Sequence, residues 1–231
     1  MAAALANPVR RNHRLVATTN ALRRLKEMGA PTDLETEEAP ASRIGRRLGP
    51  DAVHQGCLLH CDPLPERELE GYESFRRVLV LDQVTDPHNV GAVLRSCAAF
   101  AVDALIVTDR HSPRETPALA KAAAGAFDIV PTLRVRNLAN ALEALHSAGY
   151  ASLGLDAAGQ TEIGDIGPIE PVALVLGAEG RGLRQKTRET CSRLVRIALP
   201  GRMPSLNVST AAAVALYAVN RSVSSGSDDG R

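Results

Sequence analysis

Beyond about residue 75 the chain alternates short apolar runs with amphipathic stretches, and this alternation constrains the fold more than any other feature. Helical spacing of apolar residues marks the segment 138–145, and another helix is expected over about 90–100. Strands that alternate with helices predict an α/β domain with a mostly parallel sheet. Three runs are continuously apolar, as in strands buried on both faces: 78–81, 104–107 and 172–176.

The ends of these elements can also be predicted. Asn137 is a plausible N-cap for the helix that begins at residue 138, and Gly149 is its expected stop. Shorter strands are expected at 151–155 and 195–197, and an Ala-rich helix at 207–220 closes the fold. Ligands of such sheets bind beyond the carboxyl ends of the strands. The loops to examine are therefore 82–91, 177–182 and 199–207.

The first 70 residues or so differ, being poor in apolar runs and rich in Arg, Glu and Pro. A helix is expected over 17–28, capped near Thr19 or Asn20, followed by an exposed acidic loop over 31–40. The expected organisation is a small N-terminal domain, a polar linker, the α/β domain and a disordered tail. Their boundaries are 1–55, 56–74, 75–222 and 223–231.

Composition narrows the classes of function. Aromatic residues make up 3% of the chain, with no Trp, which disfavours a platform that stacks single-stranded bases. No apolar run is long enough to span a bilayer, and four cysteines are too few for a disulfide framework, so a cytoplasmic protein with reduced thiols is expected. The cluster of His54, Cys57, His60 and Cys61 lacks the spacing of a zinc finger, and no metal site is expected there.

The net charge is only +1, but basic residues form two clusters. One lies within 9–26, before Glu27, and the other follows the glycine-rich loop at 177–182. Either cluster could track phosphates, and either could simply be a solvated helix face. The candidate RNA-binding residues are Arg10, Arg11, Arg14, Arg181 and Arg184.

The first loop leads into a helix. Pro87 fixes its turn and Gly91 allows a close approach, whereas Asn89 suits either a helix cap or a catalytic group. Arg95 stands among apolar residues. Because burying an unpaired guanidinium is costly, Arg95 is expected to point at an anion or a functional site.

The other two loops carry further polar candidates. Three glycines within 177–182 permit a close ligand, but Glu179 would repel phosphate, so a nucleoside or a sulfonium fits better. The dinucleotide fingerprint, which would follow the first strand, is missing. Ser205 or Asn207 could cap the final helix. Small residues over 210–215 suit tight packing or a subunit contact.

Together the three loops resemble the three motifs of the SpoU (TrmH-like) RNA ribose methyltransferases of the SPOUT superfamily. The similar segments are 86–96, 174–182 and 206–209, in the same order and spacing, over about residues 75–222. The resemblance implies an α/β fold with a deep C-terminal trefoil knot, which binds S-adenosylmethionine and forms a homodimer through the knot region.

The resemblance also implies roles for individual residues. Asn89 and Arg95 match the catalytic positions of the first motif, Glu179 matches the acid of the second, and Ser205 and Asn207 match the polar pair of the third. Ala198 departs from the family, which often has Pro after Ile, and implies a more pliable loop. The expected cofactor-binding residues are Gly177, Ala178, Gly180, Ile197, Leu199, Gly201 and Leu206.

The N-terminal part resembles the subgroup that methylates a guanosine of 23S rRNA. Residues 53–56 resemble the segment that joins its domains, and residues 7–25 resemble part of its ribosomal-protein-like α+β substrate-binding domain. That domain normally begins earlier, so 1–55 is expected to be a partial version of it.

The implied function is S-adenosylmethionine-dependent 2′-O-methylation of a 23S rRNA guanosine. A tRNA ribose methyltransferase and a non-catalytic ribosome-assembly factor that binds RNA are the alternatives. A guanidinium is a poor base. Arg95 is therefore expected to stabilise the developing alkoxide, with a nearby RNA phosphate taking the proton.

Overall fold

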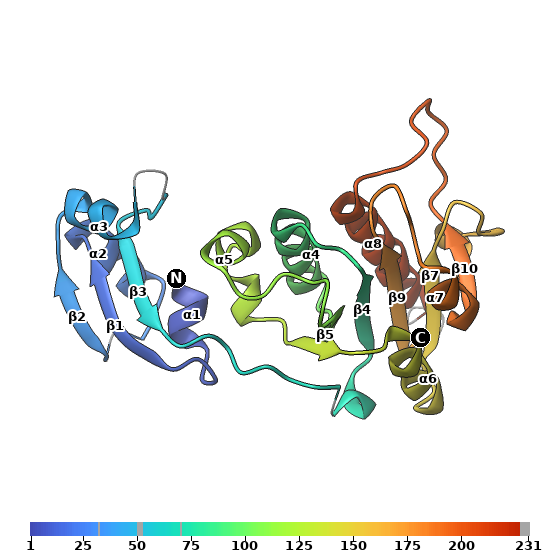
Figure 1. Ribbon diagram of the computed structural model, residues 1–231, viewed down its shortest axis with the longest axis horizontal. Coiled ribbons are helices and arrows are strands. Elements are labelled where there is room, and N and C mark those ends of the chain that lie inside the picture. The colour runs from blue at the N-terminus through green and yellow to red at the C-terminus, as the bar shows by residue number, and fades with distance from the viewer. Residues whose placement is uncertain (32, 50–52, 70, 227–231) are drawn as a thin grey trace. The chain divides into compact units, whose positions relative to one another are not determined.

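The computed structural model describes residues 1–31, 33–49, 53–69 and 71–226 (Figure 1). The chain divides into two compact units, Met1–Pro65 and Glu66–Arg231. Each unit has a sheet and a buried core of its own, and the two are described separately.

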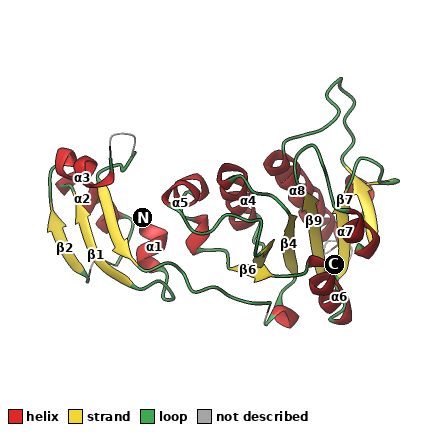
Figure 2. Ribbon diagram, in the orientation of Figure 1, coloured by secondary structure: helices red, strands yellow, loops and turns green. Residues whose placement is uncertain are grey.

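The N-terminal unit is a three-stranded sheet with the order β2-β1-β3 (Figure 2). The central strand β1 (Asn12–Ala17) runs parallel to β2 (Glu35–Glu38) and antiparallel to β3 (Cys57–Cys61). Leu15 of β1 packs with Leu25 of α2 in one cluster, and Val16 packs with Ile44 of α3 in another. The helices of this unit are α1 (Ala2–Ala6), α2 (Thr19–Glu27) and α3 (Ala41–Leu48).

Two segments of this unit differ from the sequence-based expectation. The acidic stretch predicted as a loop contains strand β2, whose Glu35 and Glu37 form ion pairs with Arg14 of β1. Strand β3 lies within the predicted linker. Its Leu58 and Leu59 pack on opposite faces of the sheet, the period-two pattern of a strand. Thr18, one residue earlier than expected, caps α2.

The C-terminal unit contains a seven-stranded sheet in which every pairing is parallel, with the order β6-β5-β4-β9-β7-β10-β8. The predicted α/β class is confirmed. The sequence patterns found five of these strands and missed β6 and β8, because short strands give little periodicity. The strands are β4 (Arg77–Asp82), β5 (Ala104–Thr108), β6 (Thr132–Val135), β7 (Ala151–Leu155), β8 (Thr161–Glu162), β9 (Val172–Gly177) and β10 (Arg193–Arg196).

Helices cover both faces of this sheet. Alternate residues of β4 point to opposite sides, so Leu79 and Leu81 join one core cluster while Val78 and Val80 join the other. The first cluster includes α4 (Pro87–Ala99), α5 (Pro117–Ala123) and α8 (Val208–Gly226). The second includes α6 (Leu138–Ser147), which contacts α7 (Gln185–Thr190). Three short 3-10 helices are η1 (Tyr72–Ser74), η2 (Ala126–Asp128) and η3 (Ile163–Asp165).

Local signals at the helix ends are largely confirmed. The Asn137 side chain accepts hydrogen bonds from the backbone N–H groups of Ala139 and Asn140, as predicted for the cap of α6. Gly149 follows that helix with φ +89°. The expected tail at 223–231 overlaps the last turn of α8 up to Gly226, and 227–231 lie outside the described residues. Within the part described, no helix combines the length and apolarity needed to cross a membrane.

Candidate functional site

The first two loops meet because β4 and β9 are neighbours in the sheet. Asp82, the last residue of β4, pairs with Gly177, the last residue of β9. Parallel strands end at the same edge, so the loops that follow them emerge side by side. The third loop follows β10 and enters α8, which packs against α4. Segments far apart in sequence therefore converge at one edge of the sheet.

Three predicted residues form one hydrogen-bonded cluster at this edge. Asn89 donates from Nδ2 to Oε1 of Glu179 at 3.3 Å. Asn207 donates from Nδ2 both to Oδ1 of Asn89, at 3.0 Å, and to Oε1 of Glu179. Each residue comes from a different one of the three predicted loop segments; Glu179 and Asn207 are exposed, and Asn89 is half-buried. The expectation that the three motifs share one site is consistent with this geometry.

Glu179 also interacts with the beginning of helix α8. Its Oε1 accepts from the backbone N–H of Val208 at 3.4 Å. The side chain of Asn207 caps the same helix, because its Oδ1 accepts from the Ser209 backbone N–H at 2.8 Å. A carboxylate is stabilised near the positive end of a helix dipole. Glu179 thus joins the glycine-rich loop to α8.

Asn89 is not a helix cap. Asp86 caps α4, its side chain accepting from the His88 backbone N–H at 3.0 Å, and Pro87 occupies the first helical position. Asn89 therefore lies inside the first turn, and its amide is available to Glu179 and Asn207. Gly91 does permit a close approach, but to helix α5: a Cβ there would lie 2.5 Å from Cβ of Ala122.

Arg95 lies on α4 with its side chain exposed, so the expectation that apolar residues surround its guanidinium was wrong. Val93, Leu94 and Cys97 are buried, but the helix turns Arg95 away from them. Within the described ranges, its guanidinium forms no hydrogen bond or ion pair. The charge is consequently free to meet an external anion.

The glycines of the second loop bring the loop against itself. Gly177 has so little room that an added Cβ would lie 2.0 Å from the carbonyl carbon of Gly182. The Gly182 backbone N–H donates to the Ala178 carbonyl at 2.8 Å, and these two residues form an isolated β-bridge. Gly180, at the tip, has φ +74°. This turn holds Glu179 outward. The sequence predicted that the glycines allow a ligand to approach closely, whereas Gly177 allows the loop's own backbone to do so.

A second polar contact anchors the end of the glycine-rich loop. Asp82 is fully buried, and its carboxylate accepts from the Arg184 backbone N–H at 3.0 Å and from Arg184 Nε at 2.6 Å. The sequence predicted an RNA contact for Arg184 and did not identify Asp82 as its partner. The structure gives Arg184 an internal partner instead. The available signal was an acid directly after a continuously apolar run, at the edge where ligands of such sheets bind.

The remaining predicted residues of the third loop are half-buried or exposed. Ile197 is half-buried against the core beneath α8, and Leu206 is half-buried as well. Leu199, Gly201 and Ser205 are exposed, and Ser205 forms no side-chain hydrogen bond with the residues that are described. Ser205 is thus the one predicted catalytic residue of this loop that the cluster does not include.

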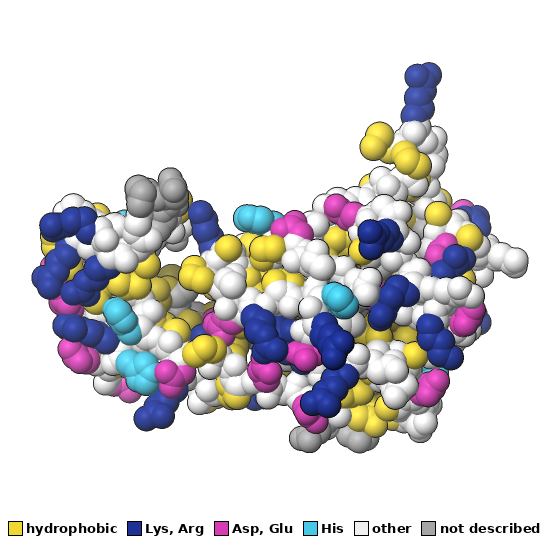
Figure 3. All heavy atoms as spheres, viewed as in Figure 1, with side chains coloured by type: hydrophobic (Ala, Val, Ile, Leu, Met, Phe, Trp, Pro, Cys, Tyr) yellow, Lys and Arg dark blue, Asp and Glu magenta, His cyan; other side chains and the backbone are white. Residues whose placement is uncertain are grey.

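The N-terminal basic residues separate into two kinds. Arg10 is buried and donates from Nη1 to the Asp62 carbonyl at 3.2 Å, so the prediction that it contacts RNA is not supported by its position. Arg14 is occupied by Glu35 and Glu37, at 3.1 and 2.9 Å. Arg11 is exposed, and in the other unit Arg181 is exposed too. On the face shown in Figure 3, basic and acidic side chains are interspersed rather than gathered into one patch.

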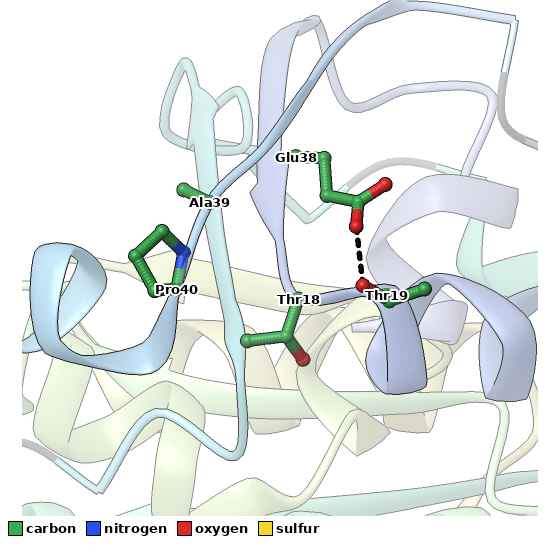
Figure 4. A pocket seen from close by; sticks show the side chains of 5 residues that line it. All are labelled: Thr18, Thr19, Glu38, Ala39 and Pro40. Atoms are coloured by element: carbon green, nitrogen blue, oxygen red, sulfur yellow. Dashed lines mark hydrogen bonds between the residues drawn. The ribbon is translucent and has the colours of Figure 1, made fainter.

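The N-terminal unit has a pocket of about 320 Å³ that sequence analysis did not find (Figure 4). It lies where the parallel strands β1 and β2 end and where α2 and α3 begin. The Thr19 hydroxyl donates to the Glu38 carboxylate across it. The lining residues are Thr18, Thr19, Glu38, Ala39 and Pro40.

The cysteines behave as packing residues. Burial raises the pKa of Cys97 to about 12 and that of Cys191 to about 11. Burial also raises the pKa of Cys57, while the N-terminal amine opposes the rise. Among the described residues, no group of three or more His, Cys, Asp or Glu side chains is placed to hold a metal ion.

Comparisons with known proteins agree with the three-loop geometry. The model of the SpoU rRNA Methylase family matches residues 76–217. The 23S rRNA (guanosine-2'-O-)-methyltransferase RlmB of Burkholderia sp is 39% identical over 201 residues, covering 85% of this chain and 81% of the relative. RlmB of Pseudomonas putida is 39% identical over 174 residues, covering 72% and 70%.

Solved structures show the same fold. The SpoU methyltransferase AviRb from Streptomyces viridochromogenes aligns with a TM-score of 0.80 at 22% identity, covering 97% of this chain and 86% of that chain. Its complex with the cofactor AdoMet aligns with a TM-score of 0.75 at 23% identity, covering 95% and 85%. The matched family region contains all three loops, and it spans more than half of the sequence. This chain is therefore a member of the SpoU rRNA methylase family.

Proposed function

We propose that this protein transfers a methyl group from S-adenosylmethionine to the ribose 2′-hydroxyl of a guanosine in 23S rRNA. The observation that carries the proposal is the cluster of Asn89, Glu179 and Asn207, which joins three loops at the carboxyl edge of the sheet. The named activity of the RlmB relatives, at 39% identity over most of the chain, supports the choice of substrate.

The donor set suits S-adenosylmethionine. Glu179 offers a carboxylate to a cationic ligand, and the half-buried Ile197 and Leu206 offer apolar surface to an adenine ring. The bound cofactor would supply an electrophilic methyl group on a sulfonium. The residues that would hold it are Gly177, Ala178, Gly180, Ile197, Leu199, Gly201 and Leu206.

Arg95 would act on the ribose oxygen. Its guanidinium is exposed and stays protonated at any ordinary pH, so it stabilises negative charge rather than accepting a proton. A positioned cation beside a developing alkoxide typically contributes about 10²–10³ in rate. The proton of the hydroxyl would pass to a phosphate of the RNA. Asn89 and Asn207 would position the loops, and exposed Ser205 would contact substrate.

The finer architecture is part of the same proposal. The crossing of the third loop before α8 would complete a deep trefoil knot around the cofactor. Val214 and Tyr217 are 37% and 55% exposed on α8, and they would form part of a homodimer interface in that region. The N-terminal unit would bind rRNA as a partial ribosomal-protein-like domain, with Arg11 among its contacts. The reaction would take place in the cytoplasm.

The test combines cofactor binding with methyl transfer. The purified protein should bind S-adenosylmethionine in calorimetry and methylate naked 23S rRNA in preference to tRNA. Substitution Arg95→Ala should lower the single-turnover rate at saturating RNA by about 10²-fold while cofactor affinity is kept. Arg76→Ala, at the opposite edge of the sheet, is the matched control and should keep full activity.

Three outcomes would contradict the proposal. No cofactor binding would indicate an RNA-binding assembly factor, and a preference for tRNA would move the substrate. A near-normal rate for Arg95→Ala would remove Arg95 from the chemistry.

A further inference from the structure

We propose that Arg110 and Arg136 bind the phosphate backbone of the substrate RNA and lead it to the reaction centre. This inference rests on the proposed function, because it extends the same site along the edge of the sheet. Neither residue belongs to the three motifs, and neither is among the RNA-binding candidates that the sequence suggested.

The register of the sheet places these residues in line with the cluster of Asn89, Glu179 and Asn207. At one end Val135 of β6 pairs with Thr108 of β5, and at the other Asp82 of β4 pairs with Gly177 of β9. Between these pairs, β4 and β5 are joined in the same register, Leu81 with Val107. Four neighbouring strands thus end at nearly the same level, over about 14 Å at a spacing of about 4.8 Å.

Arg110 and Arg136 lie immediately beyond these strand ends. The Asp109 backbone N–H donates to the Val135 carbonyl at 3.0 Å, so the two chains remain joined just past the sheet. Arg110 follows Asp109 and Arg136 follows Val135, so the two arginines flank the same hydrogen bond. The two arginines thus follow β5 and β6, and the cluster of Asn89, Glu179 and Asn207 lies at the same edge of the sheet, after β4 and β9.

Both arginines lack an internal partner, unlike their neighbours. Arg110 and Arg136 are exposed, and among the residues described neither forms a hydrogen bond or an ion pair. The nearby carboxylates are matched by two other cations: Asp109 lies 3.2 Å from Arg114, and Glu66 pairs with Arg114 and lies 3.9 Å from Arg134. The free charge at this part of the edge is therefore positive, although the net charge of the whole chain is only +1.

The opposite edge of the sheet shows a different arrangement. There Arg77 and Arg76 share one carboxylate of the protein, because Glu170 lies 3.1 Å from Arg77 and 3.8 Å from Arg76. Arg193, at the start of β10, is exposed and is a suitable reference cation far from the carboxyl edge. Within the described ranges Arg110 and Arg136 lack such a partner, whereas Arg76 and Arg77 have one, and this difference favours an anionic partner at the carboxyl edge.

RNA fits this surface because guanidinium groups recognise phosphate with two parallel hydrogen bonds. Few aromatic side chains are available for stacking, at 3% of the chain. Contacts to the backbone are consequently the main means of holding a strand here. Such contacts position the substrate and carry no sequence information, so they should set affinity rather than the choice of nucleotide.

The experiment uses the full chain with an unmodified 23S rRNA fragment and S-adenosylmethionine. The double variant Arg110→Ala/Arg136→Ala should raise KM for RNA about 10-fold or more and weaken RNA binding in a filter assay. The slope of log K against log salt should fall by about 1.4 for two lost contacts to a single strand. The kcat at saturating RNA and the cofactor affinity should stay within about twofold.

Two further variants make the result specific. Arg110→Lys/Arg136→Lys should recover most of the salt slope, because the charge is kept, and Arg193→Ala should leave KM unchanged. An unchanged KM and salt slope in the double alanine variant would overturn the inference, as would an equal loss in Arg193→Ala. A wild-type protein without methyl transfer would instead refute the proposed function, so the two failures are distinguishable.

Discussion

Substitution of Gly177 tests whether the glycine-rich loop is held by its own backbone. A Cβ at this position would lie 2.0 Å from the Gly182 carbonyl carbon, 2.2 Å from its oxygen and 2.3 Å from the Leu183 nitrogen. All three are backbone atoms, which cannot rotate away as a side chain can. Ordinary contacts between carbon atoms lie at about 3.5–4.0 Å, so the loop must open by more than about 1 Å.

The expected cost follows from what that opening breaks. It separates the bridge between Ala178 and Gly182, including their 2.8 Å hydrogen bond, and it moves Glu179 away from α8. Overpacking usually costs about 1–3 kcal/mol, and a lost hydrogen bond adds about 1 kcal/mol. Gly177→Ala should therefore lower the free energy of unfolding by about 3 kcal/mol, or keep stability by displacing the loop and losing cofactor binding.

Urea unfolding and calorimetric titration with S-adenosylmethionine measure both outcomes. Gly180→Ala is the matched control, since nothing lies within 4 Å of its added Cβ and only its φ of +74° is unfavourable. That variant should cost about 1–2 kcal/mol. If Gly177→Ala were no less stable than Gly180→Ala and bound cofactor normally, the account of the self-packed loop would be wrong.

Two more predictions concern buried groups. Asp82→Asn should lower the free energy of unfolding by about 1–3 kcal/mol, the usual range for leaving a buried group unpaired. The amide cannot accept both hydrogen bonds from Arg184, and solvent screening of the half-exposed guanidinium limits the loss. Urea unfolding that matches wild type would contradict this. Burial raises the pKa of Cys97 from 9.0 to about 12, so its contribution to stability is complete below pH 9 and is lost as the pH rises towards 12. The free energy of unfolding of wild type should fall by about 2 kcal/mol between about pH 9 and about pH 10.5, and that of Cys97→Ala should not. An equal fall in both proteins, measured by denaturant titration at each pH, would contradict this prediction.

The sequence predicted the fold class because its signals are local. Continuous apolar runs, such as the one that became β4, require burial on both faces, and a cap such as Asn137 acts within a few residues. The resemblance in three loops was carried by residue type and spacing, so Asn89, Glu179 and Asn207 were named before any geometry was known. The short strands β6 and β8 and the acidic edge strand β2 escaped prediction, since neighbouring strands rather than their own periodicity stabilise them.

Tertiary structure decided which charges are free. The sequence named Arg95 as a catalytic residue and Arg184 and Arg10 as RNA-binding candidates. The first is exposed without a partner among the described residues, the second is paired with buried Asp82, and the third is buried. Only the register of β5 and β6 brings Arg110 and Arg136 together. Amino-acid sequence alone determined the fold class, five strands of the C-terminal unit and the chemical groups of the candidate site. The pairing of those groups depends on contacts between distant segments, and only the folded chain makes them.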